Sequence, residues 1–335
     1  MTAVDAPAGS VDAGVPWHYG DPFAEQRVAA RSAAVVDRSN REVIAVPGED
    51  RLTWLHNLTS QHVLNLRDGE TTELLVLDIQ GRVEHHAVLT DFEGTAWLDV
   101  EPGTGKALLA YLESMRFWSK VEPRDATAEI AVLSVVGPQT PSLVTFGGLV
   151  RPMPWGADLL VPRESKDAEF TRLVDAGARP AGSLAFEALR VELLRPRLGV
   201  DTDDRTIPHE ARWIGTAVHL NKGCYRGQET VSKVENVGRP PRRLLLLHLD
   251  GSLDALPETG DPVTLDGKVV GRVGTAVRHH ELGPIALALI KRSVPLDAVL
   301  AAGPAEEPIA ASIDPDSVPP DNAALGREAV RNLGR

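Results

Sequence analysis

From residue 244 onward, the sequence is broken into short apolar runs that are separated by Asp-Gly and Gly-Pro pairs. The runs lie at 244–249, 262–265, 268–276 and 285–290. An Asp-Gly pair between two such runs is typical of a tight hairpin turn, because these residues tolerate positive φ. Several short strands joined in this way can bury a common interior by closing on themselves. The pattern predicts a small β-barrel over 239–302, entered through a basic linker at 239–243 (RPPRR) and followed by a flexible tail at 303–335.

Upstream of the barrel, residues 17–238 carry helical and strand-like patterns in alternation. Helices are predicted at 21–34, 49–58, 104–117, 165–176 and 183–194, and strands at 42–46, 74–77, 81–90, 95–100, 130–136 and 158–161. The first helix has a good start signal, since Asp21 can cap it and Pro22 suits its first position. Three consecutive strands interrupt the alternation of helices and strands. The order of elements therefore predicts an α+β protein with two intertwined α/β subdomains rather than one doubly wound sheet. Residues 1–16, rich in Ala, Gly, Asp and Pro, are predicted to be a flexible tail.

Charge and cysteine content narrow the classes of ligand. The chain has 335 residues, a formal net charge of -12 and one cysteine. This acidity argues against nucleic acid as the main ligand, since phosphate binding needs clustered cations. No run approaches the roughly 18–20 apolar residues of a membrane span, and the first residues lack the basic start and apolar core of a signal peptide. We therefore expect a cytoplasmic protein that binds neither nucleic acid nor membrane; the sequence indicates no oligomeric state.

The single cysteine, Cys224, lies in a polar and cationic setting. Glycines flank it at 223 and 227, and Lys222 and Arg226 are two residues away on either side. Glycine reaches positive φ freely, so the segment predicts a tight turn that exposes the thiol. Neighbouring cations favour the reactive thiolate, so Cys224 is predicted to be a functional thiol that Lys222 and Arg226 activate. The alternative is that Cys224 is a small buried apolar residue without chemistry.

Residues 222–229, KGCYRGQE, resemble the signature of the YgfZ family. Its members are folate-binding relatives of the glycine-cleavage T-protein, linked to iron–sulfur cluster assembly or repair. Segments at 51–63, 117–123 and 190–210 resemble the same family. The resemblance implies a three-domain ring of the T-protein type, made of two intertwined α/β subdomains plus the C-terminal small β-barrel. It also implies that tetrahydrofolate or a one-carbon derivative binds at the central channel.

Folate-dependent T-protein relatives carry an R-x-E near the end of a helix, followed by P-x-x-G-x-D and T-x-P-x-E. The matching residues here are Arg190, Glu192, Pro196, Gly199, Asp201, Thr206, Pro208 and Glu210. A pterin ring presents an amine and a ring N–H side by side, and one carboxylate can accept both hydrogen bonds. The resemblance assigns that role to Glu192, which would otherwise be an exposed helix residue paired with Arg190 or Arg195. The other folate contacts predicted are Arg190, Glu210, Tyr225, Gln228 and His85.

One departure from the family bears on catalysis. In the aminomethyltransferases, the strand that corresponds to 81–90 carries a pair of aspartates, one of which serves the transfer chemistry. Here Glu84 and His85 replace them, which casts doubt on amine or methylene transfer by the T-protein mechanism. A histidine can still act as a base near neutral pH, or both residues simply alternate across a half-exposed strand. Whether the protein is an enzyme stays open.

The leading hypothesis is a tetrahydrofolate-binding protein that acts in iron–sulfur cluster assembly or repair, with Cys224 as its reactive thiol. One thiol cannot hold a whole cluster, so no resident metal is predicted and any cluster would be shared with a partner. The expected partners are folate and iron–sulfur proteins or assembly factors. The alternatives are a folate-dependent aminomethyl or methyl transferase, and a small-molecule binding module without catalysis in which Cys224 is structural.

Overall fold

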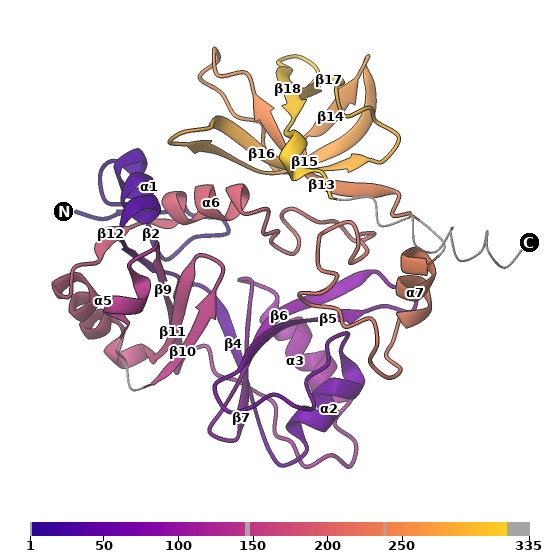
Figure 1. Cartoon of the computed structure of the whole chain (residues 1–335). Helices are drawn as coiled ribbons and strands as arrows, with labels where there is room; N and C mark the ends of the chain where they lie inside the picture. The colour runs from indigo at the N-terminus through magenta and orange to yellow at the C-terminus, as the bar shows by residue number, and fades with distance from the viewer. Residues whose placement is uncertain (1, 145–147, 237–238, 320–335) are drawn as a thin grey trace, which may run out of the picture. The chain divides into compact units, whose positions relative to one another are not determined.

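The computed structural model describes residues 2–144, 148–236 and 239–319. The chain falls into two compact units, and each is described by itself. The first comprises residues 1–57, 61–74 and 85–193, and the second comprises 58–60, 75–84 and 194–335. Neither unit is contiguous in sequence, so the chain passes between them several times (Figure 1).

The first unit contains a five-stranded sheet with a buried central strand. In spatial order its strands are β10 (Leu149–Met153), β11 (Gly156–Pro162), β9 (Ile130–Val136), β3 (Ala34–Asp37) and β12 (Arg179–Ala181). Strand β9 is the central strand, as its nearly all-apolar sequence predicts. A central strand is apolar on both sides when helices cover both faces of the sheet. Helices α1 (Pro22–Arg31) and α6 (Ser183–Glu192) pack on one face, and α5 (Lys166–Asp175) packs on the other. The predicted start of α1 is confirmed, since Asp21 caps it and Pro22 begins it.

A second five-stranded sheet follows the spatial order β5-β6-β7-β4-β8. Its strands are β5 (Thr71–Leu77), β6 (Val83–Phe92), β7 (Thr95–Val100), β4 (Glu42–Pro47) and β8 (Arg124–Asp125), with α2 (Arg51–Leu58) and α3 (Gly105–Ser114) in the connections. Strands β3 and β4 are consecutive in the chain but belong to different sheets. The two halves are therefore intertwined, as the sequence predicts.

Buried ion pairs join the two sheets within the first unit. Arg151 of β10 is fully buried, and its Nη2 lies 2.8 Å from Asp99 Oδ1 on β7 and 2.9 Å from Asp158 Oδ2 on β11. Arg41 forms further pairs with Asp99 and Glu101. Burial alone opposes the ionisation of Asp99, but the positive charges of Arg151 and Arg41 outweigh it, so the pKa of Asp99 is lowered.

The second unit contains the predicted barrel, which closes in the order β13-β16-β15-β14-β17-β18. Its strands are β13 (Arg242–Leu249), β14 (Pro262–Leu265), β15 (Lys268–His279), β16 (Gly283–Lys291), β17 (Val299–Ala302) and β18 (Ile309–Ile313). Between β14 and β15, Asp266 and Gly267 both have positive φ, 49° and 74°. The Asp-Gly pair thus forms the hairpin turn that the sequence indicates.

Parts of both predicted flexible tails need correction, while residues 320–335 of the second tail lie outside the described residues. Strand β18 lies within 303–335 and pairs with β13 and β17, and its residues Ile309, Ala311 and Ile313 face the barrel interior. Proline and alanine around it hide this period-2 pattern in the sequence. At the other end, β1 (Val4–Asp5) pairs with β2 (Pro16–His18), and Val15 is buried. Residues 4–5 and 16–18 are therefore paired strands rather than parts of a free tail.

We predict that Arg151→Met destabilises the protein by about 3–5 kcal/mol, because it leaves Asp99 and Asp158 buried without their shared guanidinium. The matched control is Arg67→Met, which removes the solvent-exposed Arg67–Glu70 pair of the same unit and should cost less than about 1 kcal/mol. Urea unfolding, read as a shift in midpoint at constant slope, measures both. Equal shifts for the two variants would contradict this account of the buried pair.

Candidate functional site around Cys224

Cys224 lies on an exposed turn just before helix α7 (Gln228–Asn236) in the second unit. The side chains around it alternate in burial. Lys222 and Tyr225 are buried, whereas Gly223, Cys224 and Arg226 are exposed. The structure therefore confirms the prediction that the Cys224 thiol is exposed.

Gly227 lets this turn press against the turn between β5 and β6. It has a φ of +83°, and a Cβ there would lie 2.6 Å from the backbone oxygen of Asp78. Gly81 sits opposite with a φ of +80°, and its Cβ would lie 2.7 Å from Thr230 Cβ. Gly223 differs: its φ is not positive, and no described atom lies within 4 Å of where its Cβ would be. The prediction of positive φ is right for Gly227 and wrong for Gly223.

Arg226 fastens the turn to both strands of the β5–β6 hairpin. Its Nε donates to the backbone oxygen of Leu77 near the end of β5. Its Nη2 pairs with Glu84 at the start of β6. These contacts give Arg226 and Glu84 a positioning role in the structure, whereas activation of the thiol by Arg226 stays a prediction.

On the other side of the turn, the buried side chain of Lys222 holds the turn in place. Its Nζ donates to the backbone oxygen of Thr59 and lies 5.0 Å from the centre of the Tyr225 ring. Tyr225 packs in a core cluster with Trp213 and Val231. Burial lowers the pKa of Lys222 to about 8 and raises that of Tyr225 to about 12. Lys222 thus lies inside the protein, although it is two residues from the exposed thiol.

The predicted folate residues lie in different surroundings. In the first unit, Glu192 is the exposed last residue of α6. Arg190 is buried, and its Nε donates to Glu187 Oε1 over 3.0 Å. His85 is half-buried on β6, with its ring centre 6.2 Å from that of Tyr111. Of these residues, Glu192 presents a carboxylate that solvent can reach.

Three predicted folate residues belong to the second unit, and two of them are buried in its interior. Glu210 is buried, and its carboxylate accepts hydrogen bonds from Arg242 Nε at 2.9 Å and Nη2 at 2.8 Å. Tyr225 is a core residue, as described above, and Gln228 begins α7. The fully engaged carboxylate of Glu210 makes it a structural partner of Arg242.

Sequence reasoning missed two anchors of this region. Arg242 was predicted to lie in a linker, but it starts β13 and also pairs with Asp203, 2.5 Å away. Ser60 is buried, and its hydroxyl donates to the backbone oxygen of Ala217 over 2.7 Å. The signal for Arg242 was a basic residue directly before an apolar run, whereas Ser60 carried none because its partners are distant in sequence.

Comparisons with known proteins show what the chain is similar to. Residues 14–146 match the family model described as the GCVT N-terminal domain. The chain is 28% identical over 270 residues to the Arabidopsis thaliana protein named "Putative transferase, chloroplastic", covering 71% of this chain and 60% of that protein, less than two thirds of its length. It is 26% identical over 306 residues to an aminomethyltransferase of Rippkaea orientalis, covering 81% of each. An aminomethyltransferase of Thermus thermophilus is also 26% identical, over 286 residues, covering 77% of this chain and 79% of that protein.

The solved structures show the fold. The glycine cleavage system aminomethyltransferase T from Bartonella henselae superposes with a TM-score of 0.80 at 18% identity, covering 94% of each chain. The protein therefore has the fold of the glycine-cleavage T-protein, which confirms the predicted fold class. Its sequence likewise resembles the aminomethyltransferases. Among the described residues, no helix is long and apolar enough to cross a lipid bilayer.

We predict that Gly227→Ala destabilises the second unit by about 1–3 kcal/mol from backbone conformation alone, before the clash with Asp78 is relieved. Gly223→Ala is the matched control and should stay within about 0.5 kcal/mol of the wild type, since space is open there. Thermal or urea unfolding compares the two. If Gly223→Ala were the more damaging, the description of this turn would be wrong.

We also predict that the stability of the wild type rises relative to Lys222→Met between about pH 8 and pH 10. Folded Lys222 loses its proton near pH 8, whereas an unfolded lysine keeps it to about 10.5. The unfolded state then binds more protons in this window, so raising the pH favours the folded state. Unfolding free energies of both proteins, measured across the window, test this. If the unfolding free energies of the two proteins changed in parallel with pH, burial would not disfavour the charged form of Lys222.

Proposed function

We propose that the protein binds tetrahydrofolate or a one-carbon derivative and acts in iron–sulfur cluster assembly or repair through Cys224. The observation that carries the proposal is an exposed thiol on a turn that is anchored on both sides. Lys222 holds one side to Thr59, and Arg226 and Gly227 hold the other to the β5–β6 hairpin. A thiol fixed in this way meets a reaction partner in one orientation at little entropic cost.

The folate half of the proposal rests on the fold and on Glu192. The T-protein fold and the similarity to aminomethyltransferases support it. The exposed Glu192 carboxylate at the end of α6 suits a pterin amine and ring N–H, which need two acceptor oxygens side by side. Glu210 is buried and fits this role poorly. When bound, the folate would supply a one-carbon carrier, while Glu192 orients its ring.

The thiol half rests on the chemistry of Cys224. An exposed cysteine thiolate can take the outer sulfur of a partner's persulfide, which releases the partner's cysteine as its thiolate, or can share in holding a cluster. The resemblance of 222–229 to the YgfZ signature supports the iron–sulfur assignment. A binding module without catalysis, in which Cys224 is structural, is the remaining non-enzymatic reading.

A folate-dependent aminomethyl or methyl transferase is the second candidate. The names of the relatives favour it. Against it, β6 carries Glu84 and His85 where the T-protein resemblance places aspartates, and Arg226 already pairs with Glu84. One-carbon transfer from formaldehyde-equivalent donors to tetrahydrofolate, measured directly, separates the two candidates.

We expect tetrahydrofolate to bind the wild type in a calorimetric titration and to bind Glu192→Ala about 10- to 100-fold more weakly, because charged hydrogen bonds to the pterin are lost. The control is Glu113→Ala, which changes an exposed glutamate in the last turn of another ten-residue helix, α3. Equal binding by all three proteins would remove Glu192 from the site. No binding by the wild type would remove folate from the proposal.

The same titration with Cys224→Ser separates the two halves. We expect this variant to bind tetrahydrofolate like the wild type, but not to restore the activity of iron–sulfur enzymes in cells that lack the protein. Full restoration by Cys224→Ser would refute the role of the thiol while leaving folate binding intact.

A further inference from the structure

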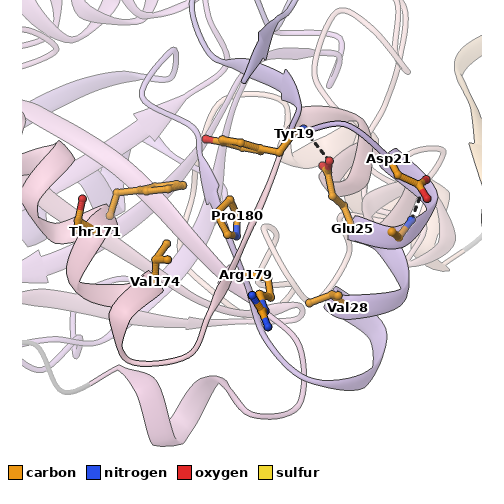
Figure 2. Close-up of a pocket in the computed structure, with 10 residues that line it drawn as sticks. Tyr19, Asp21, Glu25, Val28, Thr171, Val174, Arg179 and Pro180 are labelled. Carbon is orange, nitrogen blue, oxygen red and sulfur yellow. Dashed lines mark hydrogen bonds between the residues drawn. The ribbon is translucent and has the colours of Figure 1, made fainter. Parts of the chain in front are cut away.

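A cavity of about 570 Å³ lies in the first unit, and its lining residues include none of those proposed for the folate or thiol sites. It opens between α1, α5 and the edge strand β12, as Figure 2 shows. Pockets that hold small organic molecules have volumes of about 300–1,000 Å³. The cavity is therefore of the size that takes a small ligand.

The walls of the cavity are largely apolar and aromatic. Val28 comes from α1, Val174 from α5 and Pro180 from β12 (Figure 2). Phe170 of α5 also lines the cavity. The rings of Tyr19 and Phe170 face each other at an interplanar angle of 24°, with centres 6.3 Å apart. Such walls favour an aliphatic or aromatic body.

The acidic groups of the cavity are already satisfied by the chain. Asp21 Oδ1 accepts from the backbone N–H groups of Phe23 and Ala24, at 3.0 and 3.1 Å. Glu25 accepts from the backbone N–H of Tyr19 at 2.7 Å and from that of Gly182 at 2.8 Å. Both carboxylates are therefore taken up by helix capping and chain packing, and neither is directed to a cationic ligand.

Arg179 is different from these acids. It is exposed on β12, and none of the residues that the structure describes forms an ion pair or hydrogen bond with its guanidinium. The Tyr19 hydroxyl likewise makes no hydrogen bond within the described chain. Burial and nearby carboxylates raise the pKa of Tyr19 to about 12, so this hydroxyl stays a donor. The cavity thus combines an apolar interior with two donors that have no acceptor.

We propose that this cavity binds a small carboxylic acid with an aliphatic or aromatic body, its carboxylate on Arg179 and its body against Phe170, Val28 and Val174. The planar guanidinium matches the two oxygens of a carboxylate in a paired hydrogen bond. A phosphate is a poorer match, because phosphate sites gather several backbone and side-chain donors around the anion. A second ligand site in the first unit would be separate from the folate and thiol sites.

Calorimetry on the full chain tests this with 4-phenylbutyrate and octanoate as probes and with 4-phenylbutanamide as the uncharged analogue of the first. The key variant is Arg179→Met, which removes the charge and keeps an apolar stem. The matched control is Arg116→Met, another exposed arginine of the first unit that lies outside the cavity. Val174→Trp fills the cavity, and thermal unfolding of each variant verifies that it is folded.

We expect Arg179→Met to weaken binding of the two acids by about tenfold or more while leaving the amide unchanged, since only the charged pair is lost. Arg116→Met should bind like the wild type, and folded Val174→Trp should bind neither acid. No saturable binding of either acid to the wild type below about 10 mM would overturn the proposal. So would equal affinity of Arg179→Met for the acids, or equal affinity of the wild type for acid and amide.

Discussion

The guanidinium of Arg151 is the interaction on which the first unit depends. It lies without solvent contact between Asp99 of one sheet and Asp158 of the other. Taking three charges out of water is costly, and the cost is offset only when their geometry satisfies all of them at once. A displacement of one sheet against the other would break the buried Arg151–Asp99 pair, so we infer that this pair fixes how the sheets meet as much as it stabilises them.

One more side chain, Arg38, connects these buried ion pairs to the helix that carries Glu192. Arg38 bonds to Ser134 over 3.1 Å and lies 3.6 Å from Asp158, at the rim of the ionic cluster. Its guanidinium also stacks 4.1 Å from the centre of the Phe186 ring on α6. Helix α6 ends at Glu192, so the buried charges help to set where that carboxylate is presented.

The parts of the structure that could be predicted are those that depend on residues close together in the sequence. The buried strand β9, the capped start of α1 and the Asp266-Gly267 turn all depend on neighbouring residues. The exposure of Cys224 also followed from its immediate neighbours. Local patterns of this kind carry their own physical cause.

What could not be predicted depends on partners far along the chain. Glu210 reads as a free motif glutamate until Arg242 is seen beside it, and Arg226 reads as a free cation until Glu84 is. Strand β18 becomes recognisable only when β13 and β17 pair with it. A sequence shows which charges exist but not which of them are already used.

The β5–β6 hairpin has a consequence for how this chain comes into being. Its residues Leu75, Leu77 and Val83 share a core with Trp213 and Tyr225, which are synthesised much later. A growing chain folds from its N-terminal end as it leaves the ribosome. These apolar side chains of the hairpin therefore stay uncovered until residues 213–225 have been synthesised and can pack against them.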